Sequence, residues 1–145
     1  MGLRCVLYES WQMECCGRPF SVGDAVTWRV IPVEPGDLRK WAWDEERYAG
    51  LLRVEHHGGR GPAATGRVRA IHLVHQEYAE TAPGSRSFVP VPGKRSLEPV
   101  DSCPKWFGHG APVPGPGRRS TRNTDGVLVT LDVADAPPPE PRDRR

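Results

Sequence analysis

The 145-residue sequence lacks a long apolar run, and no segment reaches the roughly 18 apolar residues that a membrane span needs. The N-terminal stretch MGLRCVLYESWQ also lacks an apolar run long enough for a signal peptide. Both absences predict a cytoplasmic protein with no membrane association, whose cysteine thiols stay reduced.

Aliphatic residues are scarce, since Leu, Ile, Val and Phe make up 20% of the chain, while Gly and Pro contribute 16 residues each. This composition lies at the limit where apolar burial can offset chain entropy. We therefore expect one small β-rich domain over residues 1–133, in which 108–124 is a disordered insertion, followed by a disordered tail over 134–145.

The body of the chain has no excess of basic residues, because 1–101 holds 13 Lys and Arg against 13 Asp and Glu. The segment 102–124 contains Lys105, Arg118, Arg119 and Arg122 and no acidic residue. Nucleic-acid binders usually carry a basic face on the folded body. A nucleic-acid partner is therefore not expected, and a protein partner is favoured. The basic segment is either a solvated loop or a contact for phosphate or an acidic partner.

The four cysteines form no C-x-x-C pair, which lowers the expectation of a zinc ribbon or a thioredoxin-like site. Cys15 and Cys16 are adjacent and can bond to each other only through a strained ring. We therefore expect no disulfide.

Alternation of apolar and polar residues predicts strands over 3–13, 25–31, 66–78 and 126–133. The pattern fails near Ala70, and a β-bulge there would place Val68, Ile71 and Leu73 on one side.

A helix over about 37–54, with Asp37 as its N-cap, is expected to end at the stretch His56-His57-Gly58-Gly59. Residues 83–125 are expected to be mostly irregular, with a short strand near 88–91. Together these features predict a mainly β fold: a small SH3-like or partly open β-barrel with one inserted helix and a long irregular loop.

A metal site is one interpretation of Cys15, Cys16, His56 and His57, because two thiolates and two imidazoles can hold zinc tetrahedrally. Adjacent residues in an extended chain point to opposite faces, so both pairs would need turns. The structural alternative is a buried cysteine beside an exposed one, and imidazoles placed at a helix C-terminus. A third interpretation pairs one of the cysteines as a nucleophile with one of the histidines as its base.

The aromatic residues Trp11, Trp28, Trp41, Trp43 and Tyr48 are expected either to fill the core or to form a stacking platform. Trp43 lies off the apolar line of the expected helix. If it is exposed, it is the leading candidate for a ligand contact, with Trp11 and Trp28 as further candidates. His72 and His75 are expected to be solvated strand residues.

The motifs V-G-D-x-V-x-W (Val22 to Trp28) and G-x-V-x-x-I (Gly66 to Ile71) resemble the strand pair of SH3-like small barrels, including KOW-type modules. The longer motif W-Q-x-x-C-C-G-x-P-F-x-V-G-D-x-V-x-W (Trp11 to Trp28), with E-H-H-G (Glu55 to Gly58), is similar to an uncharacterised actinomycete family, a domain of unknown function. This resemblance implies no activity.

No carboxylate pair, Ser-His-Asp set or phosphate-binding loop stands out in the sequence. We therefore expect a non-enzymatic binding or accessory module of unknown ligand, with no cofactor. The alternative is a zinc-binding protein that uses the Cys and His positions above, and a thiol-dependent enzyme comes third.

Overall fold

A computed structural model describes residues 2–57 and 63–133. The fold is mainly β, as the sequence predicts. Its elements in chain order are β1 (Gly2–Glu9), α1 (Ser10–Cys16), β2 (Ala25–Pro32), α2 (Pro35–Lys40), β3 (Leu52–Val54), β4 (Ala63–Glu80), β5 (Phe88–Val100), β6 (Ala111–Val113) and β7 (Ser120–Val133).

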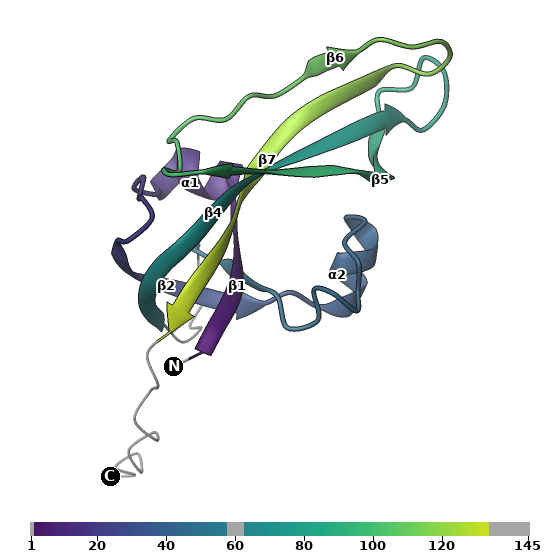
Figure 1. Ribbon diagram of the computed structural model, residues 1–145. Coiled ribbons are helices and arrows are strands. Elements are labelled where there is room, and N and C mark those ends of the chain that lie inside the picture. The colour runs from purple at the N-terminus through teal and green to yellow at the C-terminus, as the bar shows by residue number, and fades with distance from the viewer. Residues whose placement is uncertain (1, 58–62, 134–145) are drawn as a thin grey trace.

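The strands form one sheet that closes partly into a ring, which confirms the expectation of a partly open β structure. Along the sheet β4 is followed by β2, β3, β1 and β7, and β7 pairs again with β4. All of these pairings are antiparallel except that of β1 with β3, which is parallel. The far halves of β4 and β7 extend beyond the ring together with the edge strands β5 and β6 (Figure 1).

The main apolar core faces the inside of the ring, as period-2 alternation requires. From β1 it receives Val6 and Tyr8, and from β2 it receives Trp28 and Val30, all of them buried. A second apolar cluster lies on the other face of the sheet, where α2 and the segment after it pack; its buried members are Leu38, Trp43, Leu51, Val74 and Leu128.

The β-bulge predicted near Ala70 is confirmed, because the register of β4 against β7 shifts between Val68 and Ala70. As expected, Val68 and Ile71 are buried in the main core, and Leu73 packs against it. The extra residue lets one long strand bend to pair with β2 at one end and β5 at the other.

The strands predicted at 25–31 and 126–133 are confirmed as β2 and the second half of β7. The strand predicted over 3–13 stops at Glu9, because the chain turns there into α1. Ser10, Gln12 and Met13 are the buried residues of this helix, so its inner face packs on the sheet rather than extending it.

The helix predicted over 37–54 is wrong beyond its first turn. α2 ends at Lys40, Ala42 adopts a left-handed backbone conformation with φ of 61°, and the chain re-enters the sheet as β3. The apolar residues whose spacing suggested a helix pack against the sheet instead, and Leu51 and Val54 are buried there. The expectation that the two histidines lie at a helix C-terminus is also wrong, because His56 and His57 follow strand β3. Gly58 and Gly59 lie outside the described residues.

Residues 83–125 are not mostly irregular, because β5 pairs with β4 and β6 pairs with β7. The segment 108–124, which we expected to be disordered, forms a hairpin in which β6 pairs with the first residues of β7. The Thr124 amide donates to the Gly108 carbonyl at 2.8 Å, and the Gly110 amide donates to Asn123 Oδ1 at 2.7 Å. The first residues of β7 also pair with the distant strand β4, and a local sequence pattern does not reveal that pairing. The tail predicted to be disordered, 134–145, lies outside the described residues.

Neither α1 nor α2 has the length and apolar character that crossing a membrane would require.

Replacing Gly126 with Ala should destabilise the fold. A Cβ there would lie 2.2 Å from the Tyr8 carbonyl oxygen and 3.0 Å from the Ser10 nitrogen, and the residue has φ of 143°. We expect the free energy of unfolding to fall by about 1–3 kcal/mol. Urea denaturation measures this. Gly108→Ala is the matched control, because nothing lies within 4 Å of its Cβ position; equal stability of the two variants would contradict the steric account.

Candidate functional site

The parallel pairing of β1 with β3 brings two short segments to the same end of the sheet. Parallel strands run in the same direction, so the chain that follows each strand emerges at a common edge. α1 follows β1 and ends in Cys15 and Cys16, while β3 is followed by Glu55, His56 and His57. Residues some forty positions apart in the sequence therefore meet there.

The end of α1 is held in place by hydrogen bonds from a distant residue. Lys105 Nζ donates to the carbonyl oxygens of Met13 at 2.7 Å and Gly17 at 3.1 Å. The cation also complements the negative end of the helix. Gly17 leaves no room for a side chain, because a Cβ would lie 2.5 Å from the Tyr8 hydroxyl. The helix therefore stops at a defined point, with both cysteines exposed.

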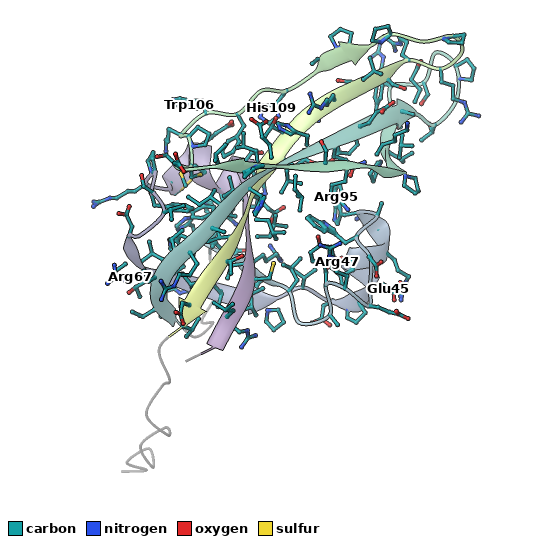
Figure 2. All side chains as sticks on the ribbon, viewed as in Figure 1. Glu45, Arg47, Arg67, Arg95, Trp106 and His109 are labelled. Carbon is teal, nitrogen blue, oxygen red and sulfur yellow. A yellow bond between two sulfur atoms is a disulfide. The ribbon has the colours of Figure 1, made fainter. Side chains whose placement is uncertain are left out.

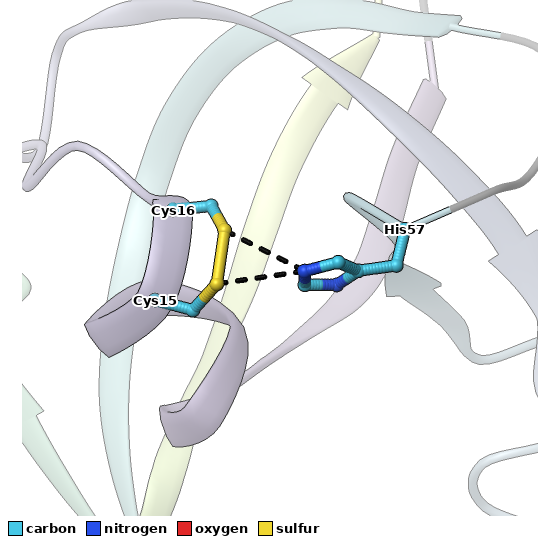
Figure 3. Close-up of side chains that lie close together, drawn as sticks. All are labelled: Cys15, Cys16 and His57. Atoms are coloured by element: carbon cyan, nitrogen blue, oxygen red, sulfur yellow. Dashed lines mark hydrogen bonds between the residues drawn. A yellow bond between two sulfur atoms is a disulfide. The ribbon is translucent and has the colours of Figure 1, made fainter.

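The imidazole of His57 points at the two sulfur atoms of this helix end (Figure 3). Its Nε2 lies 3.4 Å from Cys15 Sγ and 3.6 Å from Cys16 Sγ. All three potential ligand atoms lie within 4.8 Å of one another. Three of the four residues of the predicted metal site are thus brought together.

Cys15 and Cys16 are joined by a disulfide bond, so our expectation of no disulfide is wrong. The expectation rested on the strain of a ring closed between adjacent cysteines. Both cysteines lie in the last turn of α1, and their sulfur atoms are bonded to each other there.

His56, the fourth predicted ligand, turns away from the sulfur atoms. Its Nε2 forms a hydrogen bond with the Tyr8 hydroxyl, and its amide donates to Gln12 Oε1 at 3.0 Å. Burial, and secondly the charge of His57, lowers the pKa of His56 and favours the neutral imidazole. Burial raises the pKa of Tyr8 to about 12. The two adjacent imidazoles therefore point in different directions, as expected for an extended chain.

The Glu55 carboxylate contacts His57 at its backbone amide and at Nδ1, the ring nitrogen remote from the sulfur atoms. Its Oε1 accepts a hydrogen bond from the His57 amide at 2.9 Å and lies 4.0 Å from His57 Nδ1. Gln12 Nε2 donates to the same oxygen at 2.9 Å. The Gln12 hydrogen bond, followed by that from the His57 amide, lowers the pKa of Glu55. A carboxylate beside the remote nitrogen of an imidazole favours a tautomer whose other nitrogen is free to bind a metal.

Trp11, one of the predicted ligand contacts, forms one wall of the site. Its ring stacks on His57 with centroids 5.5 Å apart and an interplanar angle of 15°. Trp11 and Cys15 are four residues apart on α1, the spacing that places side chains on one helix face. The indole limits the positions that the imidazole can adopt.

The other two predicted tryptophan contacts lie elsewhere. Trp28 is buried in the main core. Trp43 is not exposed as our hypothesis required, since only 8% of it is accessible, and the Arg95 guanidinium lies 3.7 Å from its ring centroid.

The remaining cysteines are apart from the cluster, and burial raises the pKa of Cys103 to about 12, which leaves it an unreactive thiol.

Two further sequence-based expectations are corrected. His75 is not solvated: it is 9% exposed and hydrogen-bonded to Thr124 Oγ1 at 2.9 Å and Glu98 Oε1 at 2.8 Å. In the basic segment, Arg119 is exposed but not free, because its guanidinium pairs with the buried Glu80 carboxylate at 3.2 Å.

Sequence reasoning missed the buried polar support of the site. Gln12 is fully buried and bonds to both Glu55 and His56, and Tyr8 bonds to His56. A glutamine on the apolar face of α1 was the available signal, because a buried amide requires polar partners.

Comparison with known proteins adds a family but no activity. Residues 2–133 match the family described as "Family of unknown function (DUF6578)". No curated protein and no solved structure matches the chain.

Glu55→Gln should reduce stability at neutral pH and have less effect in acid. The pKa of Glu55 is lowered in the folded protein, so its carboxylate contributes stability above its unfolded pKa and loses that contribution as the pH falls through the folded pKa. We expect the variant to be about 1 kcal/mol less stable at pH 7, with the difference shrinking below about pH 4.5. Urea denaturation across this range measures it.

Glu46→Gln is the control for this series, because Glu46 is exposed and its carboxylate pairs with no cation among the described residues. Its stability should match that of the wild type at every pH. A Glu55→Gln difference that stays constant from pH 7 to pH 3 would refute the assigned role of the carboxylate.

Proposed function

We propose, since the chain belongs to this family of unknown function, that its function follows from the Cys15–Cys16–His57 cluster and is the binding of a zinc ion. In this proposal the protein is a non-enzymatic accessory protein. The observation that carries the proposal is the convergence of two sulfur atoms and one imidazole nitrogen within 4.8 Å of one another.

The two sulfur-to-nitrogen distances suit a tetrahedral zinc ion. Zinc binds thiolate sulfur at about 2.3 Å and imidazole nitrogen at about 2.0–2.1 Å, so tetrahedral angles separate S and N by about 3.5 Å. The cluster has 3.4 Å and 3.6 Å. Only the two sulfurs need to move apart to accept the ion.

Zinc binding requires the reduced protein, because thiolates and not a disulfide are zinc ligands. Two electrons and two protons convert the Cys15–Cys16 disulfide to two thiols, and binding of the ion then releases the thiol protons. The disulfide-bonded and zinc-bound forms are therefore mutually exclusive.

The surroundings supply further features of a zinc site. Glu55 lies at ion-pair distance from the remote nitrogen of His57, which is the arrangement of a supporting carboxylate behind a metal-bound histidine. Both cysteines are exposed, so the ion could enter from solvent and keep a fourth position for water or a partner's ligand.

The cluster supports a thiol-dependent enzyme less well. Such an enzyme would place one cysteine in a cavity beside an imidazole. Neither cysteine lines the cavity beside Leu7 and Trp41 or the cavity beside Cys5 and Tyr48. The imidazole is also nearly equidistant from both sulfurs, so it does not select one of them as a nucleophile.

The protein reduced with tris(2-carboxyethyl)phosphine, which supplies the two electrons, should bind one zinc ion per chain. Competition with a chromophoric chelator measures the affinity, and native mass spectrometry measures the stoichiometry. Loss of even an outer partner of a zinc ligand costs about 10–100-fold in affinity, so His57→Ala should weaken binding by more than about tenfold. Cys15→Ser and Cys16→Ser should do the same.

His56→Ala is the matched control, because the adjacent imidazole faces Tyr8. It should keep the wild-type zinc affinity, and the disulfide-bonded wild type should bind no zinc. Failure of the reduced wild type to bind zinc would end the proposal, as would equal losses in His56→Ala and His57→Ala.

A further inference from the structure

A second site lies on the α2 side of the sheet, in a cavity of about 630 Å³ that we call the α2 cavity. Its lining includes Leu7, Val33, Trp41, Arg53, Arg95 and Asp125. Arg95 extends from β5 toward α2 (Figure 2). The volume lies within the range of pockets that enclose small organic ligands.

Apolar and aromatic surfaces form much of this lining. Leu7 and Val33 contribute aliphatic surface, and two half-exposed indoles, those of Trp11 and Trp41, also face the cavity. Trp43 lines it too, but its ring is covered by Arg95. Because the Trp11 ring stacks on His57, the Trp41 indole is the one that offers an accessible flat apolar surface to a ring of similar width.

Both arginines of the lining have partners in the protein, although Arg95 Nε is buried with no hydrogen-bond partner among the described residues. Arg53 Nη1 lies 3.6 Å from a Glu9 carboxylate oxygen and 3.3 Å from a Glu55 carboxylate oxygen. Arg95 donates to the carbonyl oxygens of Trp41 and Ala42. The lining also holds the carboxylates of Glu9, Asp37 and Asp125, so it presents both signs of charge and selects neither in a ligand. The lining therefore favours a neutral ligand.

The remaining polar groups are a mixture of donors and acceptors. Asp125 Oδ2 accepts from the Tyr78 hydroxyl at 2.5 Å, which leaves Oδ1 as an acceptor. Asn123 Oδ1 accepts from the Gly110 amide, which leaves its NH₂ group as a donor. Hydroxyl groups suit such a mixture, because each can both donate and accept.

We propose that the α2 cavity binds a neutral disaccharide, with one sugar ring against Trp41 and its hydroxyls on Asp125 and Asn123. A pyranose ring combines apolar C–H faces with a hydroxylated rim and carries no charge, which matches the three properties of the lining. This inference rests on the cavity alone and does not depend on the zinc site.

Titration of the intact protein with maltose, cellobiose and N,N′-diacetylchitobiose tests this inference, with calorimetry and tryptophan fluorescence as readouts. At least one of the three should bind saturably. Trp41→Ala should weaken that binding by about tenfold, the equivalent of about 1.4 kcal/mol. Trp106→Ala is the matched control, since Trp106 is 68% exposed and is not part of the lining.

Three results would overturn the inference: no saturable binding of any of the three disaccharides, equal losses in Trp41→Ala and Trp106→Ala, or tighter binding of glucose 6-phosphate than of the neutral sugars. The last result would show that the cavity selects charge. Because Trp41 is about half exposed, its replacement should leave the fold intact, and an unchanged thermal unfolding midpoint verifies this.

Discussion

The parallel pairing of β1 with β3 is the constraint on which the arrangement of the site depends. Within a sheet whose other ring pairings are antiparallel, this single pairing places the ends of two strands at one edge. Val6 lies opposite Leu52 and Leu7 opposite Arg53, so the register fixes how far each chain runs before it leaves the sheet. Helix α1 and the segment Glu55 to His57 then meet with no freedom to slide.

The buried polar groups behind the site explain why adjacent histidines differ in role. Gln12, anchored on the inner face of α1, bonds at once to Glu55 and to the His56 amide. The His56 side chain forms a hydrogen bond with Tyr8, whereas His57 points outward at the sulfur atoms. A buried amide is costly unless it is paired, so the Gln12 bonds to the Glu55 carboxylate and the His56 backbone specify the conformation of the segment.

The sequence predicts well those features that depend on local alternation. The inward face of β2, with Trp28 and Val30, and the bulge near Ala70 both follow from period-2 patterns and a single break in them. Features set by distant partners are not predictable in this way. Leu51 and Val54 match a helical spacing, yet they are buried by a sheet whose partner strands lie elsewhere in the sequence.

In the candidate site too, the residue types are predictable from the sequence, whereas the geometry set by distant segments is not. The sequence identifies Cys15, Cys16 and His57 by residue type, and alternation correctly implies that neighbouring histidines diverge. It gives no sign that α1 begins at Ser10, which is what turns both cysteines toward one imidazole. The α2 cavity is hidden for a related reason, because Trp41, Asn123 and Asp125 come from segments that only the complete sheet brings together.

Zinc K-edge X-ray absorption spectroscopy of the reduced, zinc-loaded protein tests the central claim most directly. The account predicts two sulfur ligands at about 2.3 Å together with nitrogen or oxygen ligands at about 2.0–2.1 Å, and loss of the imidazole signature in His57→Ala. A spectrum with no sulfur ligands, or one that His57→Ala leaves unchanged, would contradict it.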